Sequence, residues 1–294
     1  MSNLLQSFIN TNQPLIEKKL DLLIKELKAP TELKEAMAYS LQAGGKRIRP
    51  LYTLAVLEEL NVQSEDAIVV ASTIEMIHTY SLIHDDLPCM DDDDLRRGKP
   101  TNHVVFGEAL AVLAGDALVT LAFGIIARLN RLTAEQKVQL IDQLSYAAGA
   151  EGMVGGQVLD MLGEGKYLSL AELEEVHVNK TGALLSFSIL AGGVIANAPS
   201  KMMQALKSYA FRIGLAFQIQ DDILDIEGTS EQLGKTAGKD ALSEKNTYPS
   251  ILTIDGAKEQ LQNQYNLAIE ALQTVGLHEG LLVEFANYIT KRSN

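Results

Sequence analysis

Apolar residues recur at three- and four-residue intervals along most of the chain, which is the pattern of amphipathic helices. The first such run begins with Leu4, Leu5, Phe8 and Ile9 and continues to Ile24. Sustained alternation of apolar and polar residues, the pattern of half-buried strands, is absent from the sequence. The spacing predicts helices near residues 3–26, 31–43, 48–60, 64–84, 106–129, 134–148, 151–162, 169–196, 199–226, 257–274 and 279–292.

Helices of this length must bury a face on one another, so we expect an all-α fold, a large helical bundle around a central cavity. The 294 residues are 47% hydrophobic and 21% charged, which is ordinary for a soluble globular protein. No linker rich in Gly, Ser or Pro divides the chain. We therefore expect residues 1–294 to form a single domain.

The stretch Val104–Ala127 is apolar on nearly every side, which predicts burial all round, in the bundle centre or against a second subunit. Glu108 and Asp116 interrupt it, so we expect no membrane span. The N-terminus lacks a basic start followed by an apolar core, and no signal peptide is predicted. These features favour a cytoplasmic protein.

Charge and cysteine content exclude several classes of function. The net charge of −13 argues against nucleic acid or an anionic membrane surface as the main partner. The one cysteine, Cys89, allows neither an intramolecular disulfide nor a zinc site of several cysteines. Against this acidic background, the basic clusters around Lys46 and Arg96 are local exceptions.

The most unusual stretch is His84–Thr101, HDDLPCMDDDDLRRGKPT, in which six of eighteen residues are aspartates. Carboxylates this close repel one another unless a cation lies among them. Mg²⁺ suits such a group because one or two carboxylates and substrate phosphates usually hold it. The basic residues that follow indicate an anionic ligand, although a solvated acidic loop is the alternative.

A second acidic cluster, Asp221, Asp222 and Asp225, lies within an apolar helical run, FQIQDDILDIEG. Residues four apart share a helix face, so Asp221 and Asp225 are expected to point the same way, with Asp222 at the edge. Carboxylates among apolar residues are unfavourable without a compensating cation. This cluster therefore strengthens the prediction of a metal site.

A glycine-rich basic segment, Gly44–Pro50, precedes another helix and carries Lys46, Arg47 and Arg49. By itself it is equally consistent with a solvated turn. At the other end of the chain, Lys291-Arg292 is interpreted as a frayed terminus, with a basic tail that closes over the site as the alternative.

Together, HDDLPCMDDDDLRRGKPT and QDDILD resemble the two aspartate-rich motifs of trans-isoprenyl diphosphate synthases, and the resemblance is closest to bacterial farnesyl diphosphate synthases. Matching segments extend from about residue 44 to 240. The family implies an all-α bundle, a homodimer, and three Mg²⁺ ions per active site that hold an allylic diphosphate between the motifs.

The resemblance also assigns roles. The implied metal ligands are Asp85, Asp91 and Asp221, supported by Asp86, Asp222 and Asp225. The implied site for isopentenyl diphosphate comprises Lys46, Arg49, His78 and Arg97. The residues implied to contact the allylic diphosphate are Arg96, Lys180, Thr181, Gln218 and Lys235.

Product length is expected to depend on Tyr80 and Ser81, which lie roughly 6–8 Å along the helix from Asp85. In the family, an aromatic residue at this position goes with fifteen-carbon products, so Tyr80 is interpreted as the floor of the chain pocket. The expected activity is therefore condensation of isopentenyl diphosphate with dimethylallyl and geranyl diphosphates to farnesyl diphosphate. Two alternatives stay open: a geranylgeranyl diphosphate synthase and a non-catalytic partner subunit of a prenyltransferase.

Overall fold

The computed structural model describes residues 1–227 and 246–292, and within these ranges the chain is almost entirely helical. The elements are α1 (Asn3–Lys25), α2 (Thr31–Leu41), α3 (Ile48–Glu59), α4 (Ala67–Asp85), β1 (Leu95–Arg96), β2 (Lys99–Pro100), α5 (Asn102–Phe106), α6 (Glu108–Ala127), α7 (Ala134–Ala148), α8 (Met153–Gly163), α9 (Leu170–His177), the π-helix η1 (Val178–Gly182), α10 (Ala183–Ile195), α11 (Ser200–Glu227), α14 (Tyr248–Gln273) and α15 (Leu281–Lys291). The predicted all-α bundle is confirmed.

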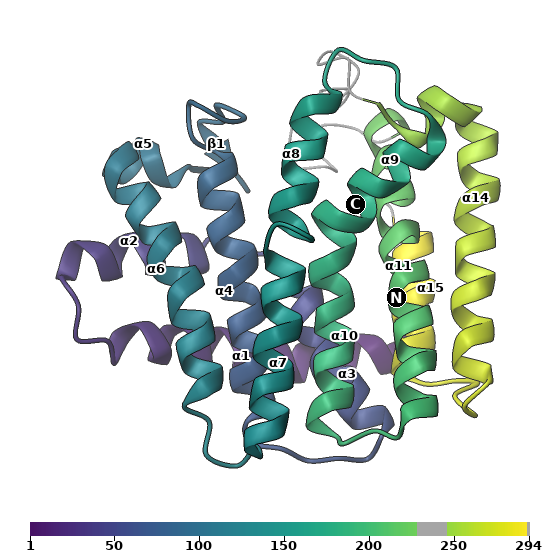
Figure 1. The fold of residues 1–294 in the computed structure, drawn as a ribbon, viewed down its shortest axis with the longest axis horizontal. Helices are drawn as coiled ribbons and strands as arrows, with labels where there is room; N and C mark the ends of the chain where they lie inside the picture. Colours follow the sequence, from purple (N-terminus) through teal and green to yellow (C-terminus); the bar gives the residue numbers. More distant parts are fainter. Residues whose placement is uncertain (228–245, 293–294) are drawn as a thin grey trace.

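The long helices stand side by side, and α1 crosses behind them (Figure 1). Helix α4 packs between α3 and α6, α10 packs on α3, α7 and α11, and α14 packs along α11. One hydrophobic core runs through these contacts and includes the fully buried Tyr52, Phe187, Tyr209 and Phe285. The C-terminal ends of α4 and α11, which carry the two acidic motifs, lie at the same end of the bundle (Figure 1).

Several predicted helix boundaries are wrong for identifiable reasons. The helix expected at 169–196 is interrupted by the π-helix Val178–Gly182. Before the helix expected from residue 257, a helical turn begins at Tyr248 after a capping box in which Thr247 and Ser250 bond each other's backbone, and a kink at Thr253 (φ 68°) separates that turn from the long part of α14. The stretch expected as a helix from 106 is divided at Gly107, whose φ of 84° ends α5 before α6 begins.

The composition of α6 predicted burial all round, in the bundle centre or against a second subunit. Within this chain, one side of α6 is exposed. Its inner residues Ala114 and Leu118 are fully buried, whereas Val112 and Leu113 are 38% and 55% exposed. By length and composition alone, α6 and the run Leu170–Ile195 could cross a membrane, and 39% and 61% of their apolar windows are buried. The core helices of soluble proteins pass the same test, so the absence of a span stays a prediction.

The contact between α3 and α10 depends on close backbone approach at Gly192. A Cβ at this position would lie 2.7 Å from Val56 Cβ and 2.8 Å from the carbonyl oxygen of Thr53. The Thr53 hydroxyl in turn donates to the carbonyl oxygen of Ser188 at 2.7 Å, which ties the two helices together.

We therefore expect Gly192→Ala to lower the free energy of unfolding by about 1–3 kcal/mol, because a backbone atom has to move. The neighbouring Gly193→Ala is the control, since its Cβ would meet mainly the flexible thioether of Met203 at 2.5 Å. Urea denaturation measures both. Equal losses in the two variants would contradict this account of the helix contact.

Candidate active site

The first acidic motif begins at the C-terminal end of α4 and folds back on itself. The backbone N–H of Asp91 donates to the carbonyl oxygen of Asp85 at 2.8 Å, which brings the two residues together across the turn that contains Pro88. Burial raises the pKa of Asp85 to about 6; the positive charge of Lys180 opposes this shift and the negative charge of Asp91 adds to it. A carboxylate that is so poorly solvated gains from a divalent cation.

Asp86 has a different environment from Asp85. It is buried and accepts from Arg96 Nε at 2.7 Å, and Arg96 Nη2 forms an ion pair with Asp86 Oδ1 at 2.5 Å. Burial opposes the charge of Arg96, but the hydrogen bonds and charge of Asp86 raise the pKa of the guanidinium overall. Arg96, expected at the allylic diphosphate, is thus held by Asp86 in this structure, at the edge of the first motif.

A two-stranded hairpin that the sequence did not indicate carries Arg96 and Arg97. Strands β1 and β2 pair Arg96 with Lys99, and the two turn residues, Arg97 and Gly98, have φ angles of 53° and 73°. Two positive φ angles are typical of the tight turns that match strand twist. Glycine adopts them readily but arginine does not, so only Gly98 was a signal for this turn.

The turn directs Arg97 toward the glycine-rich basic segment. Arg97 Nη1 donates to the carbonyl oxygen of Gly44. A Cβ on Gly45, whose φ is 123°, would lie 2.6 Å from the same nitrogen. Position 45 therefore requires glycine for two reasons: its backbone conformation, and the Arg97 guanidinium that packs on it.

The four residues that the family resemblance assigned to isopentenyl diphosphate meet in one cavity of about 410 Å³. Lys46, Arg49, His78 and Arg97 all line it, together with Arg292. His78 and Arg49 contact each other, with 3.4 Å between His78 Nε2 and Arg49 Nη1. The structure thus brings together every residue of the predicted site for isopentenyl diphosphate.

The electrostatics of this cationic cavity favour an anionic ligand. Burial lowers the pKa of Lys46, and the charge of Arg292 lowers it further. Burial and the charges of Arg49 and Arg97 lower the pKa of His78 well below its ordinary value, so its imidazole is neutral at physiological pH. Cations this close are mutually unfavourable, and a diphosphate would relieve the repulsion while accepting forked hydrogen bonds from arginine.

The second acidic motif divides into one accessible and two buried aspartates. The Asp221 side chain is 44% exposed and contacts Arg292 Nη2 at 2.6 Å. Asp222 is buried and accepts from the backbone N–H of Tyr248 at 2.9 Å, the first residue of α14. Asp225 is buried as well. The expectation that it points the same way as Asp221 stays a prediction.

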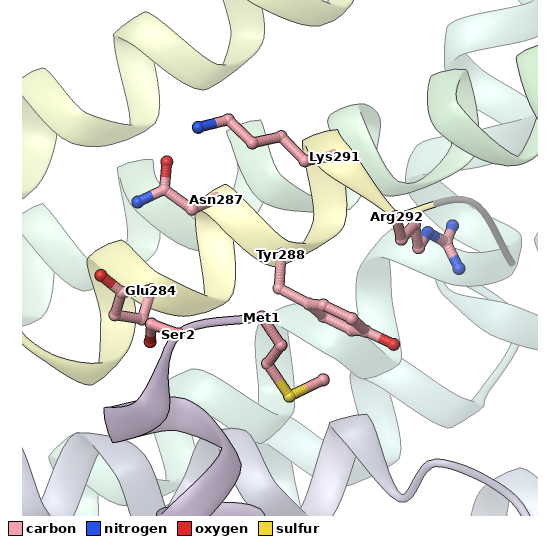
Figure 2. A pocket seen from close by; sticks show the side chains of 7 residues that line it. All are labelled: Met1, Ser2, Glu284, Asn287, Tyr288, Lys291 and Arg292. Carbon is pink, nitrogen blue, oxygen red and sulfur yellow. The ribbon is translucent and has the colours of Figure 1, made fainter.

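Arg292 is not part of a frayed terminus, which corrects the sequence interpretation. Its guanidinium lies 4.1 Å from the ring centre of Phe217 and donates to the Phe217 carbonyl oxygen as well as to Asp221. Its carbonyl oxygen accepts from Gln220 at 2.9 Å. Figure 2 shows Arg292 beyond the end of α15, on the side toward which Tyr288 extends, while Lys291 points away. Tyr288 and Arg292 both line the cationic cavity.

The π-helix between α9 and α10 carries Lys180 and Thr181. Lys180 Nζ contacts Asp160 Oδ2 of α8 at 2.6 Å, and a Cβ on Gly156 would lie 2.1 Å from the backbone nitrogen of Lys180. Thr181 is half-buried beside it. Single-turn π-helices often occur at functional sites. Here the π-helix and Gly156 place the lysine close enough to Asp85 to act on its pKa.

The structure also describes the surroundings of Gln218, Tyr80 and Ser81. Gln218 Nε2 lies 3.4 Å from His177 Nδ1, and the His177 ring stacks on Tyr248 at 5.6 Å. Tyr80 is buried, and the hydroxyl of Ser81 donates to the carbonyl oxygen of His78 at 2.9 Å. Lys235 lies outside the described residues.

The sequence did not identify several residues of this site, because each of them contributes by binding a site residue that lies elsewhere in the chain. Asp160 holds Lys180, Tyr248 holds Asp222, and the buried Glu75 accepts from Arg47 Nη1 at 2.5 Å beneath the basic segment. The sequence GQVLD around Asp160 was the one available signal.

The donor set fits Mg²⁺ held jointly with a ligand. Among residues 1–227 and 246–292, no three His, Cys, Asp or Glu residues lie close enough to hold a metal ion together. Mg²⁺ ordinarily takes only one or two protein carboxylates and completes its shell with water and phosphate oxygens. Asp85, Asp91 and Asp221 suit this arrangement.

Comparisons with known proteins identify the family to which the chain is similar. Residues 30–276 match the family model described as polyprenyl synthetase. The farnesyl diphosphate synthase of Bacillus subtilis is 49% identical, with 100% of both chains covered. A chloroplastic geranylgeranyl pyrophosphate synthase of Catharanthus roseus is 45% identical, with 91% of this chain and 76% of that protein covered. The crystal structure of a geranyltransferase from Legionella pneumophila superposes with a TM-score of 0.86 at 33% identity, with 98% of each chain covered.

Gly45→Ala is expected to displace Arg97 and weaken the binding of inorganic diphosphate about tenfold, the loss of one charge-assisted hydrogen bond. Gly44→Ala is the matched control, because Gly44 also has a positive φ but an added Cβ would meet no atom within 4 Å. Calorimetric titration in EDTA isolates the cationic cavity from the metal site. Equal affinities in the two variants would exclude the proposed contact between Gly45 and Arg97.

Asp85→Asn is expected to stabilise the metal-free protein at pH 7.5. Because the pKa of Asp85 rises from 3.8 to about 6 on folding, its protonated form favours folding below about pH 4, and this contribution is lost as pH rises through about 6. The melting temperature of the variant should exceed that of the wild type at pH 7.5, and the difference should disappear near pH 4. The exposed Asp94→Asn is the control; a pH-independent difference would contradict the argument.

Proposed function

The chain belongs to the polyprenyl synthetase family, and on that premise we propose that it is a Mg²⁺-dependent farnesyl diphosphate synthase. One observation carries the proposal. A cationic cavity suited to a diphosphate without bound metal adjoins carboxylates suited to a diphosphate that is held through metal ions. The ion pair between Arg292 and Asp221 marks the boundary, because Arg292 lines the cavity and Asp221 is the accessible acid of the second motif.

The two substrates are assigned to these two halves. Isopentenyl diphosphate binds in the cationic cavity through Lys46, Arg49, His78 and Arg97. The allylic diphosphate binds between Asp85, Asp91 and Asp221, which would hold up to three Mg²⁺ ions. Arg96, Lys180 and Lys235 contact the same diphosphate, after Arg96 and Lys180 leave Asp86 and Asp160.

The reaction proceeds by ionisation, condensation and elimination. Bound Mg²⁺ supplies Lewis-acid stabilisation of the negative charge on the leaving diphosphate. The allylic C–O bond breaks, and the electron pair stays with the diphosphate. Oxygen atoms of Thr181 and Gln218 face the allylic cation in a pocket that excludes water. The double bond of isopentenyl diphosphate forms the new C–C bond, and the departed diphosphate accepts the proton that is lost.

A second round on geranyl diphosphate gives the fifteen-carbon product, and Tyr80 ends the pocket. The buried position of Tyr80 on α4, one and a half turns below Asp85, supports this assignment. A geranylgeranyl diphosphate synthase is the alternative within the family, in line with relatives of that name. A non-catalytic partner subunit is disfavoured because the chain retains both aspartate motifs.

We also propose that residues 1–294 form one prenyltransferase domain and that two copies form a cytoplasmic homodimer. The exposed apolar face of α6, with Val112 and Leu113, supports the homodimer, because exposed apolar patches commonly mark protein interfaces. Val104 and Val105 of α5, which packs on α6, are exposed as well. The molar mass measured by light scattering in solution tests it, and a stable monomer would contradict it.

The purified chain, incubated with dimethylallyl diphosphate, labelled isopentenyl diphosphate and Mg²⁺, is expected to give farnesol as the main product after phosphatase treatment. Asp221→Asn should reduce turnover by about 10²–10³-fold, because it removes stabilisation of the leaving group, and the exposed Asp94→Asn should not. Geranylgeraniol as the main product would support the longer-chain alternative. Absence of isopentenyl diphosphate consumption would support the partner subunit instead.

A further inference from the structure

His84, the residue before the first metal-ligand candidate, is placed between α4 and α6 rather than in the acidic site. Its Nε2 lies 3.1 Å from the carbonyl oxygen of Val112 in α6. A carbonyl oxygen only accepts hydrogen bonds, so Nε2 carries the proton and donates. The ring is therefore engaged with the neighbouring helix, and α4 and α6 lie side by side along this contact (Figure 1).

Gly115 makes room for this ring. A Cβ at Gly115 would lie 2.1 Å from His84 Nε2 and 2.6 Å from His84 Cδ2. Both distances are far below ordinary van der Waals contact, so any side chain at position 115 would push the imidazole out of its seat by more than an ångström. The seat is completed by the Val112 carbonyl one helical turn away.

The seated ring packs against Tyr80. The centres of the two rings are 5.6 Å apart, and their planes are inclined by 79°, an edge-to-face arrangement. Residues four apart share a helix face, so His84 stands directly above Tyr80 on α4. Asp85 and Ser81 form the equivalent pair on the adjoining face. His84 thus connects α6 to Tyr80, the residue assigned to the floor of the chain pocket.

We infer that His84, seated over Gly115, is a positioning residue that sets product length by holding the Tyr80 ring in place. This inference rests on the proposed function, since it concerns the depth of the same chain pocket. His84 acts through Tyr80 and does not contact the reacting atoms. Without the imidazole, the phenol ring gains space on the side of α6 and no longer closes the pocket.

The test compares products of four proteins made under identical conditions: wild type, His84→Ala, Tyr80→Ala and the double variant. We expect His84→Ala to raise the ratio of twenty-carbon to fifteen-carbon product about two- to tenfold, the range expected for loss of one edge-to-face ring contact. In the Tyr80→Ala background, the same change should have no further effect on the ratio. The ratio is used because a loss of folded enzyme lowers both products equally.

Two glycine variants of α6 provide an independent check. Gly115→Ala should shift the ratio in the absence of any change to α4, because it displaces His84. Gly124→Ala is the matched control in the same helix, since its Cβ would meet chiefly the mobile end of Arg128 at 2.7 Å. Melting temperatures identify a variant that fails to fold.

The outcomes separate this inference from the function itself. A wild type that makes no prenyl diphosphate overturns the proposed function. A wild type that makes farnesyl diphosphate, together with a His84→Ala variant of unchanged product ratio, overturns the role of His84 alone. An effect of His84→Ala that persists undiminished in the Tyr80→Ala background overturns the claim that it acts through the tyrosine.

Discussion

At one end of the helical bundle, charged side chains are partly or fully removed from water, and the rest of the structure depends on pairing them. Four ion pairs manage it: Arg96 with Asp86, Lys180 with Asp160, Arg292 with Asp221, and Arg47 with Glu75. A buried charge without a partner is strongly unfavourable, so the fold has to bring its partner to it, across 28 residues for Arg47 and Glu75 and 71 residues for Arg292 and Asp221. The long helices of the bundle are the means by which these distant segments meet.

Because of these pairs, neighbouring aspartates of one acidic motif have different partners and different exposure. Asp222 binds the N-terminus of α14, where the helix dipole favours an anion, while Asp221 stays accessible. Asp86 anchors a hairpin, while Asp85 is left with a pKa raised to about 6 by burial. Adjacent aspartates in the sequence are therefore not equivalent, because Asp86 and Asp222 are buried whereas Asp85 and Asp221 are only partly buried.

The sequence predicted the helices and the two acidic motifs because both depend on local spacing. It also predicted that Lys46, Arg49, His78 and Arg97 share a site, through the resemblance to a family rather than through spacing. It failed where distant contacts override local preference. Arg97 adopts a left-handed conformation that its own side chain disfavours, and the π-helix at Lys180 exists where α8 approaches at Gly156. The ordered Arg292 depends on Phe217 and Asp221, some seventy residues away.

The hairpin turn between β1 and β2 has a mechanical consequence. Arg96 binds Asp86 of the acidic motif, and the next residue, Arg97, packs on Gly45 at the edge of the cationic cavity. One peptide bond joins the two arginines, and the turn leaves that bond little freedom. A ligand held by Arg96 and a ligand held by Arg97 would therefore act on the two sides of a single turn.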